Sequence, residues 1–112
     1  MFNNENLKNY DLEKVVAEFI VYIPQLPDGK MKIKIIENPL VEEKYFGLSG
    51  KYVGKTNILF KYKYISDGAI EGGITIEEAL KNTILAFNKR VEKFGQRKIT
   101  YKNIEYLEWP EY

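Results

Sequence analysis

Gly54, Lys55 and Thr56 form a Gly-Lys-Thr triplet, which is the ending of a phosphate-binding loop. Such a loop also requires a glycine at the position of Ser49, because that glycine lets the backbone wrap around the phosphates. It further requires a helix after the loop, whose N-terminus holds the anion. Here the glycine is replaced by serine, and the residues after Thr56 alternate as in a strand. The pattern disfavours nucleotide hydrolysis, while binding of a small molecule or nucleotide by residues 47–56 remains an alternative.

The adjacent acidic residues Glu77 and Glu78 could act as a general acid and base. Their spacing also has a structural explanation, because Glu78 follows Thr75 by three residues, as in a helix capping box. Carboxylates in a first turn interact favourably with the helix dipole. We therefore expect this pair to begin a helix rather than to catalyse a reaction.

The sequence contains no Cys and no His. This composition excludes disulfides, Cys/His zinc sites, thiol nucleophiles and imidazole bases. The remaining carboxylates, lysines and hydroxyls show no spacing that is typical of a catalytic or metal site. We expect a protein that is not an enzyme and that uses no cofactor or metal.

Lysines alternate with apolar or aromatic residues in residues 30–35 and 60–64, which is the pattern of strands with one solvated face. If these strands are neighbours, the lysines share one face of a sheet. That face could bind nucleic acid or an acidic protein surface, or it could face only solvent. The lysines concerned are Lys32, Lys34, Lys61 and Lys63.

Two other segments are candidates for contact with a partner. One is a glycine-rich loop over residues 45–55, and the other is the C-terminal YLEWPEY, which contains Tyr106 and Tyr112. Tyr and Trp are enriched in interface hot spots because they bury a large rigid area and keep one polar atom. Packing of the tryptophan on the sheet is an equal alternative. The candidate contacts in these segments are Tyr45, Lys51, Tyr52, Lys55 and Trp109.

The chain has 112 residues, 45% of them hydrophobic, and a formal net charge of +1. This length and composition predict a single domain over residues 1–112. The neutral balance argues against a strongly basic nucleic-acid protein. We find no signal peptide or apolar span, so we expect a cytoplasmic protein. The many Tyr, Lys, Ile and Asn residues are typical of AT-rich bacterial or phage genes.

The apolar patterns predict an antiparallel sheet of three to five strands with one long helix packed on one face, a two-layer α+β sandwich. Residues 15–36 contain two β-rich runs around a Pro-Asp-Gly turn, which predicts a hairpin. The first run also fits helical spacing, so a short helix there stays open.

The later segments are predicted in the same way. Residues 40–57 read as a short strand, a turn and a loop that contains Gly47, Gly50 and Gly54. Residues 58–65 read as a strand, and residues 66–73 as a turn and an irregular approach to the helix. The helix is predicted over residues 76–94, with Gly95 in the left-handed conformation after it. Residues 98–109 predict a last strand with a bulge near Asn103.

Residues 64–94 combine a strand, a turn that ends in glycine, and a Gly-x-Thr-x-Glu-Glu-Ala-Leu helix start followed by an asparagine. This stretch resembles HicB-type antitoxin domains. The resemblance implies a small α+β domain that acts without catalysis, by binding an RNA-cleaving toxin and covering its active site. Many such proteins add a C-terminal DNA-binding segment, which we do not expect here. The matching residues are Gly68, Gly73, Thr75, Glu77, Glu78, Ala79, Leu80 and Asn82.

We therefore expect a small protein that binds and inhibits a partner macromolecule, namely a nuclease-type toxin or a defence effector. An antitoxin, an immunity protein or a phage anti-CRISPR protein would fit this description. The alternatives are a nucleic-acid-binding module that uses the lysine face, and a small-molecule or nucleotide-binding protein that uses residues 47–56. Homodimerisation through edge strands also stays open.

Overall fold

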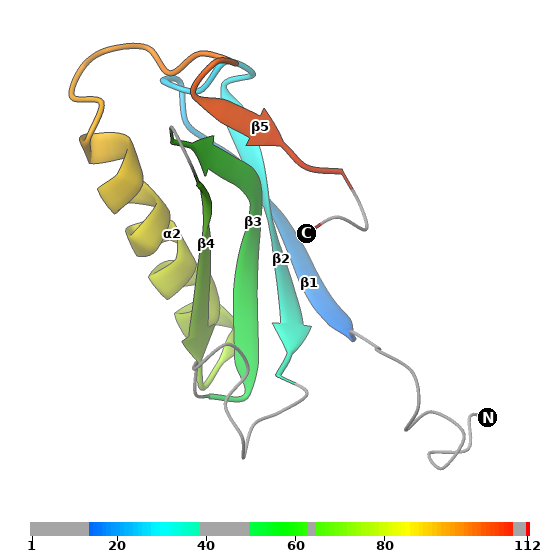
Figure 1. The fold of residues 1–112 in the computed structure, drawn as a ribbon. Helices are drawn as coiled ribbons and strands as arrows, with labels where there is room; N and C mark the ends of the chain where they lie inside the picture. Colours follow the sequence, from blue (N-terminus) through cyan, green and yellow to red (C-terminus); the bar gives the residue numbers. More distant parts are fainter. Residues whose placement is uncertain (1–13, 39–49, 63–64, 109–111) are drawn as a thin grey trace.

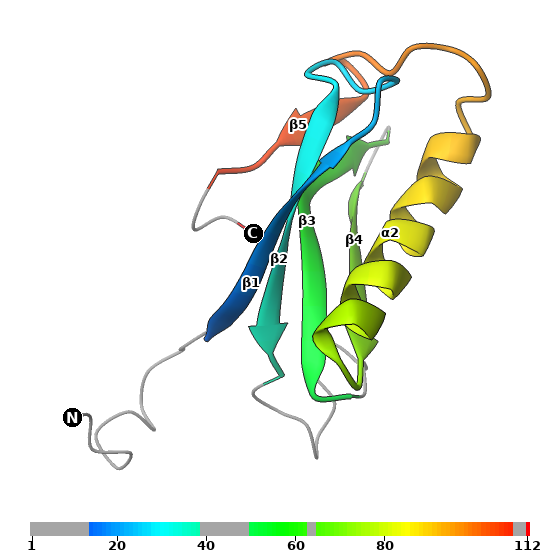
Figure 2. The same ribbon diagram turned by 180° about the vertical axis from the view of Figure 1, so that it is seen from behind.

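The computed structural model describes residues 14–38, 50–62, 65–108 and 112. These residues form one antiparallel sheet in the order β1-β2-β3-β4, with a short β5 that pairs with β3, and one helix, α2. Figures 1 and 2 show the helix on one face of the sheet and β5 with the C-terminal residue on the other side. The predicted two-layer α+β fold is confirmed. The strands are β1 (Val15–Tyr22), β2 (Lys30–Glu37), β3 (Tyr52–Lys61), β4 (Ser66–Gly73) and β5 (Ile104–Tyr106), and α2 spans Ile76–Glu92.

The first two strands form the predicted hairpin. Ile23 N–H donates to the Gly29 carbonyl (2.9 Å), and Gly29 takes a φ of 71°, which a glycine adopts without strain. β1 pairs with β2 along its whole length, with a bulge between Val15 and Ala17. The segment that could have been a helix is therefore a strand, because its β-branched and aromatic residues have a complete partner strand to pack beside.

Two predicted irregular segments are strands instead. β3 begins at Tyr52, inside the predicted glycine loop, and β4 occupies the predicted turn before the helix. Both strands contain glycines where α2 approaches closely. A Cβ on Gly54 would lie 2.2 Å from Thr83 Oγ1, and one on Gly73 would lie 2.3 Å from the Ala79 nitrogen. The glycines that weakened the strand pattern are thus needed for helix packing.

The helix begins as predicted. The Thr75 hydroxyl accepts a hydrogen bond from the Glu78 N–H at 3.0 Å, and Glu77 and Glu78 occupy the first turn. Ala79, Thr83 and Phe87 are its buried residues. The helix ends at Glu92, two residues before the predicted end, and Gly95 has the expected positive φ of 59°.

The last strand is much shorter than predicted. Residues 101–103 form a turn, in which the Asn103 side chain accepts a hydrogen bond from the Thr100 N–H at 2.9 Å. The slip in the alternation near Asn103 therefore marks this turn and not a bulge. β5 follows it and pairs with Ile58, Leu59 and Phe60 of β3.

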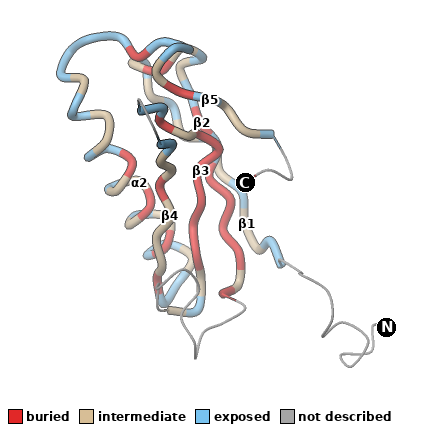
Figure 3. The backbone as a smooth tube through the Cα atoms, viewed as in Figure 1, coloured by how far each residue is buried: buried red, intermediate tan, exposed pale blue. Residues whose placement is uncertain are grey.

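The main core lies between the sheet and α2. Phe60 packs against Phe87, with ring centroids 5.3 Å apart, and Met31, Ile33 and Ile35 of β2 are buried in the same cluster. In Figure 3 the buried residues run along β2 and β3, whereas β1 is mostly partly buried or exposed. Because alternate residues of a strand point to opposite faces, the residues between these core positions lie on the other face, called the back face below.

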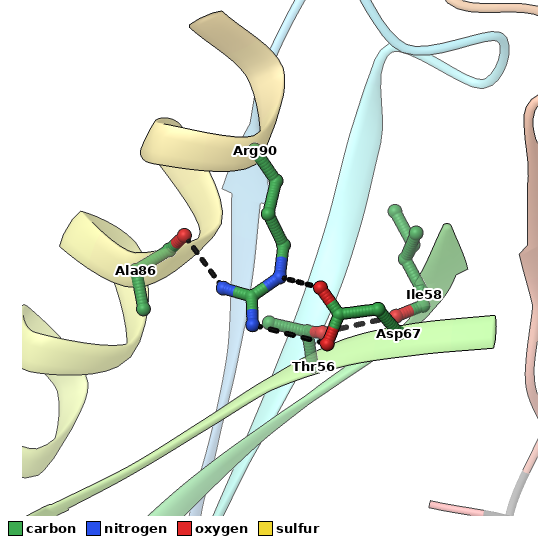
Figure 4. A network of polar contacts seen from close by, with 5 residues as sticks. All are labelled: Thr56, Ile58, Asp67, Ala86 and Arg90. Atoms are coloured by element: carbon green, nitrogen blue, oxygen red, sulfur yellow. Dashed lines mark hydrogen bonds and ion pairs between the residues drawn. The ribbon is translucent and has the colours of Figure 1, made fainter. Parts of the chain in front are cut away.

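Side chains of α2 also bind β4 directly. The Arg90 guanidinium donates two hydrogen bonds to the Asp67 carboxylate, at 2.6 and 3.1 Å, and a third to the Ala86 carbonyl at 2.8 Å (Figure 4). The hydrogen bond to Asp67 raises the pKa of Arg90. This charged fork ties the last turns of the helix to the start of the outer strand β4.

Candidate functional site

A cleft of about 430 Å³ opens on the back face, between the β1–β2 hairpin and the C-terminal segment. Its walls carry both signs of charge together with two tyrosines. The lining residues are Glu18, Asp28, Lys30, Met31, Lys32, Asn57, Tyr106, Leu107, Glu108 and Tyr112.

The cleft begins at Asn57, where one edge of β3 stops pairing with β2 and starts pairing with β5. Up to Thr56, β3 pairs with β2, and from Ile58 onward the same edge pairs with β5. Asn57 lies between the two ladders: its carbonyl accepts the Leu107 N–H at 2.7 Å, and its side-chain oxygen accepts the Lys32 N–H at 2.8 Å. The hairpin and β5 therefore diverge from one residue, and the space between them is the cleft.

Tyr106 fixes the wall of the cleft to the hairpin. Its hydroxyl donates to the Lys30 carbonyl at 3.0 Å and accepts the Asp28 N–H at 3.3 Å. Tyr101, whose ring lies 6.3 Å from that of Tyr106, donates to the Asp28 carboxylate. Burial raises the pKa of Tyr106, and the hydrogen bond to Asp28 raises that of Tyr101. Both hydroxyls therefore keep their protons at neutral pH and serve as donors.

Tyr112 closes the other end of the cleft. Its ring lies 4.9 Å from the Lys34 ammonium, its carbonyl accepts a hydrogen bond from that ammonium, and its hydroxyl donates to Glu18 at 3.0 Å. Burial, followed by the hydrogen bond to Glu18, raises the pKa of Tyr112 to about 12. Lys34 is fully buried beneath this residue.

The predicted lysine face is therefore only partly a solvated surface. Lys32 and Lys61 are exposed, but Lys34 and Lys55 are buried, and the two buried lysines lie opposite each other on β2 and β3. The expectation that Lys34 is solvated is wrong, because the alternation pattern identifies the face of a residue and not what covers that face. Lys63 lies outside the described residues.

The predicted glycine loop lies elsewhere on the molecule. Lys51 is exposed, and its ammonium lies 5.5 Å from the ring of the half-buried Tyr52, in a groove beside the start of α2. Tyr52 and Asn57 are five residues apart on β3, which is roughly 17 Å along a strand. The structure therefore does not bring these residues together with Lys32. Tyr45 and Trp109 lie outside the described residues.

The Gly-Lys-Thr triplet lies inside β3. Gly54 is buried under α2, Lys55 is buried on the back face, and Thr56 donates its hydroxyl proton to the Ile58 carbonyl at 3.3 Å. These backbone groups belong to sheet ladders, so they do not form a loop that cradles phosphate. The expectation of a loop is wrong for residues 52–56.

Sequence reasoning placed Tyr106 and Tyr112 in one aromatic group, and both line the cleft. It missed the contributions of Asp28 and Asn57. Asp28 belongs to the Pro-Asp-Gly turn, where an aspartate is expected for the turn alone. Asn57 stands at the centre of a strand, where asparagine is disfavoured, and this mismatch is the signal that could have identified it.

No protein-family model matches the chain. No curated protein and no solved structure matches it either. Among the described residues, no helix is long and apolar enough to cross a membrane. The same residues contain no group of three or more His, Cys, Asp or Glu side chains that could hold a metal ion.

Proposed function

We propose that this chain is a non-catalytic protein that binds a partner protein through the back-face cleft. By covering the functional surface of the partner, the chain inhibits the partner's activity. The observation that carries the proposal is the cleft itself, which combines tyrosine side chains with lysines and carboxylates in one concave surface. Tyrosines and mixed charges are suited to protein surfaces, which present both signs of charge and apolar area together.

The charge distribution supports a protein partner over nucleic acid. Lys30 and Lys32 are exposed at the cleft, but Glu18, Asp28 and Glu108 line it as well. A nucleic-acid surface is dominated by cations, because affinity comes largely from contacts with phosphates. The burial of Lys34 and Lys55 further reduces the cationic area.

The resemblance of residues 64–94 to HicB-type antitoxins suggests the class of partner, a nuclease-type toxin or a defence effector. Two of the matching residues also have a structural role, because Gly73 and Asn82 lie in the contact between α2 and β4. The class of partner therefore rests on the resemblance alone, and the binding surface rests on the cleft.

The test is affinity capture from bacterial lysate with the tagged chain, followed by a nuclease assay on the captured protein. The double variant Lys30→Glu/Lys32→Glu reverses the exposed charge at the cleft, and Lys81→Glu/Lys89→Glu makes the same change on the exposed side of α2. We expect the first variant to weaken binding at least about tenfold, roughly 1.4 kcal/mol, and the second to bind normally. Equal binding by both variants would show that the cleft is not the surface.

A parallel titration with single-stranded RNA and DNA separates the alternative function. A protein partner should give an affinity that depends less steeply on salt, whereas nucleic acid should give a steep linear fall of log K with log salt concentration, in proportion to the phosphates contacted. Tight, salt-sensitive binding of either oligonucleotide, with no captured protein, would overturn the proposal.

A further inference from the structure

β1 exposes the backbone of three residues at the edge of the sheet. Ile23 N–H donates to Gly29, and hydrogen-bonded pairs in an antiparallel ladder recur at every second residue. After the bulge, from Ala17 onward, the odd-numbered residues of β1 therefore bond to β2, and the backbone groups of Glu18, Ile20 and Tyr22 point outward. The same alternation requires the even-numbered N–H groups of β2 to point toward β3. The Lys32 N–H does so, as does that of Asn38 just after the end of β2.

The side chains of this edge are also unlike those of a protected edge. Natural edge strands are commonly blunted by lysine or proline, and β1 contains neither. Ile20 is 50% exposed and Tyr22 is 73% exposed, although both belong to the part of β1 that pairs with β2 without a register shift. In the described part of the chain, no strand pairs with this edge. β1 thus presents both an unpaired backbone and apolar side chains.

We infer that β1 pairs with β1 of a second copy, in antiparallel orientation, about a twofold axis at Ile20. In this register Ile20 lies opposite Ile20 of the second copy, and Glu18 lies opposite its Tyr22. The three outward-facing residues of each copy then exchange about six backbone hydrogen bonds. A twofold axis makes the contact isologous, so the assembly closes as a dimer and does not extend into a fibre.

Charge selects this partner and this register. Glu18 is the one charged residue of β1, and the register centred on Ile20 places it beside the Tyr22 ring and near Lys30, which is the cross-strand neighbour of Tyr22. The two Glu18 residues are then about 13 Å apart along the strands. A register shifted by two residues places Glu18 opposite Ile20, and a larger shift places the two Glu18 carboxylates opposite each other, which is destabilising.

The dimer goes beyond the proposed function, because it also sets where the two clefts lie relative to each other. The twofold axis is perpendicular to the sheet, so the two helices lie on one face of a continuous sheet and the two clefts lie on the other. A dimeric or repetitive partner could then be bound at two points, which raises avidity without any new contact.

Sedimentation equilibrium of the full chain tests the dimer, over about 1 µM to 1 mM, because a single strand pair is a small interface. We expect the wild type to shift from monomer to dimer in this range and Ile20→Lys to stay monomeric. Leu85→Lys is the matched control, since Leu85 is also 50% exposed but lies on α2. A monomeric wild type, or a dimer that Ile20→Lys leaves unchanged, would overturn the inference.

Cysteine cross-linking tests the register, because the natural sequence has no Cys. Under mild oxidation Ile20→Cys should form a disulfide-linked dimer, since directly opposed residues have Cα atoms about 5.5 Å apart. Glu18→Cys and Tyr22→Cys should each cross-link poorly alone and well when mixed. Faster cross-linking of Glu18→Cys alone than of Ile20→Cys, or equal cross-linking of Leu85→Cys, would contradict this register.

Discussion

The two edges of the sheet differ in how their backbone is covered. At the β4 edge, Asn82 of α2 donates to the Gly72 carbonyl at 2.9 Å, and Arg90 holds Asp67 through its charged fork. At the β1 edge, Ile20 and Tyr22 are exposed. An edge strand is a liability unless something covers it. The chain uses side chains of its helix to bind one edge, and the other edge is the one for which we propose an intermolecular contact.

The largest expected effect is the difference in the free energy of unfolding between proline substitutions at two adjacent residues of β1, Val21 and Ile20. Val21→Pro removes an N–H that bonds to β2, so we expect a loss of at least about 3 kcal/mol in the free energy of unfolding. Ile20→Pro removes an N–H that points outward, so we expect a loss below about 1 kcal/mol. Urea unfolding at protein concentrations where the chain is monomeric measures both values. Equal losses would mean that the assigned alternation of β1 is wrong.

Gly73→Ala should give the next largest effect, at the closed edge. Its Cβ would lie 2.3 Å from the Ala79 nitrogen, and backbone atoms cannot rotate away as a side chain can. We expect a loss of about 2 to 3 kcal/mol from overpacking, measured by urea unfolding. Gly95→Ala is the control, because its Cβ would meet no atom within 4 Å and only the positive φ is strained. A Gly73→Ala loss no larger than that of Gly95→Ala would show that the start of α2 is not seated on β4.

The closed edge also explains which elements could be predicted from the sequence. The β1–β2 turn, the start of the helix and Gly95 depend on neighbouring residues, and all were predicted correctly. β4 was missed because SDGAIEGG has little intrinsic strand preference. It becomes a strand through contacts that α2 makes with it, and those contacts require the glycines that obscured the pattern.

The candidate site was harder to predict for the same reason. Alternation assigns Lys34 to the back face correctly, but its burial depends on Tyr112, which is distant in the sequence. The cleft depends on the exchange of β2 for β5 beside β3, which occurs at Asn57. No local pattern describes which strand lies next to which, so the cleft requires the tertiary structure.

Substitutions at Asn82 test how much the hydrogen bond from its side chain to the Gly72 carbonyl stabilises the β4 edge. Asn82→Ala removes the donor to the Gly72 carbonyl and should cost about 1 kcal/mol in the free energy of unfolding. Asn82→Asp replaces the donor by an ionised carboxylate, which only accepts, and should cost more at neutral pH. The difference between these variants should shrink below about pH 4, where a protonated carboxyl can donate. Asn88→Asp, on the exposed side of α2, is the control for the added charge.

The last effect should appear only at high pH and involves Tyr112, whose hydroxyl donates a hydrogen bond to Glu18 of the open edge. Its pKa is raised to about 12 in the folded protein, compared with about 10 in an unfolded chain. The stability from the neutral hydroxyl is therefore fully present below about pH 10 and is lost as the pH rises through about 12. We expect the difference in unfolding free energy between the wild type and Tyr112→Phe to change only in this interval, and the difference in their tyrosinate absorbance to titrate near its upper end. Because burial is the larger cause of the shift, Glu18→Gln should lower this midpoint only in part. A midpoint near 10 in the wild type would mean that Tyr112 does not cover the back face, and that the cleft has no wall at that end.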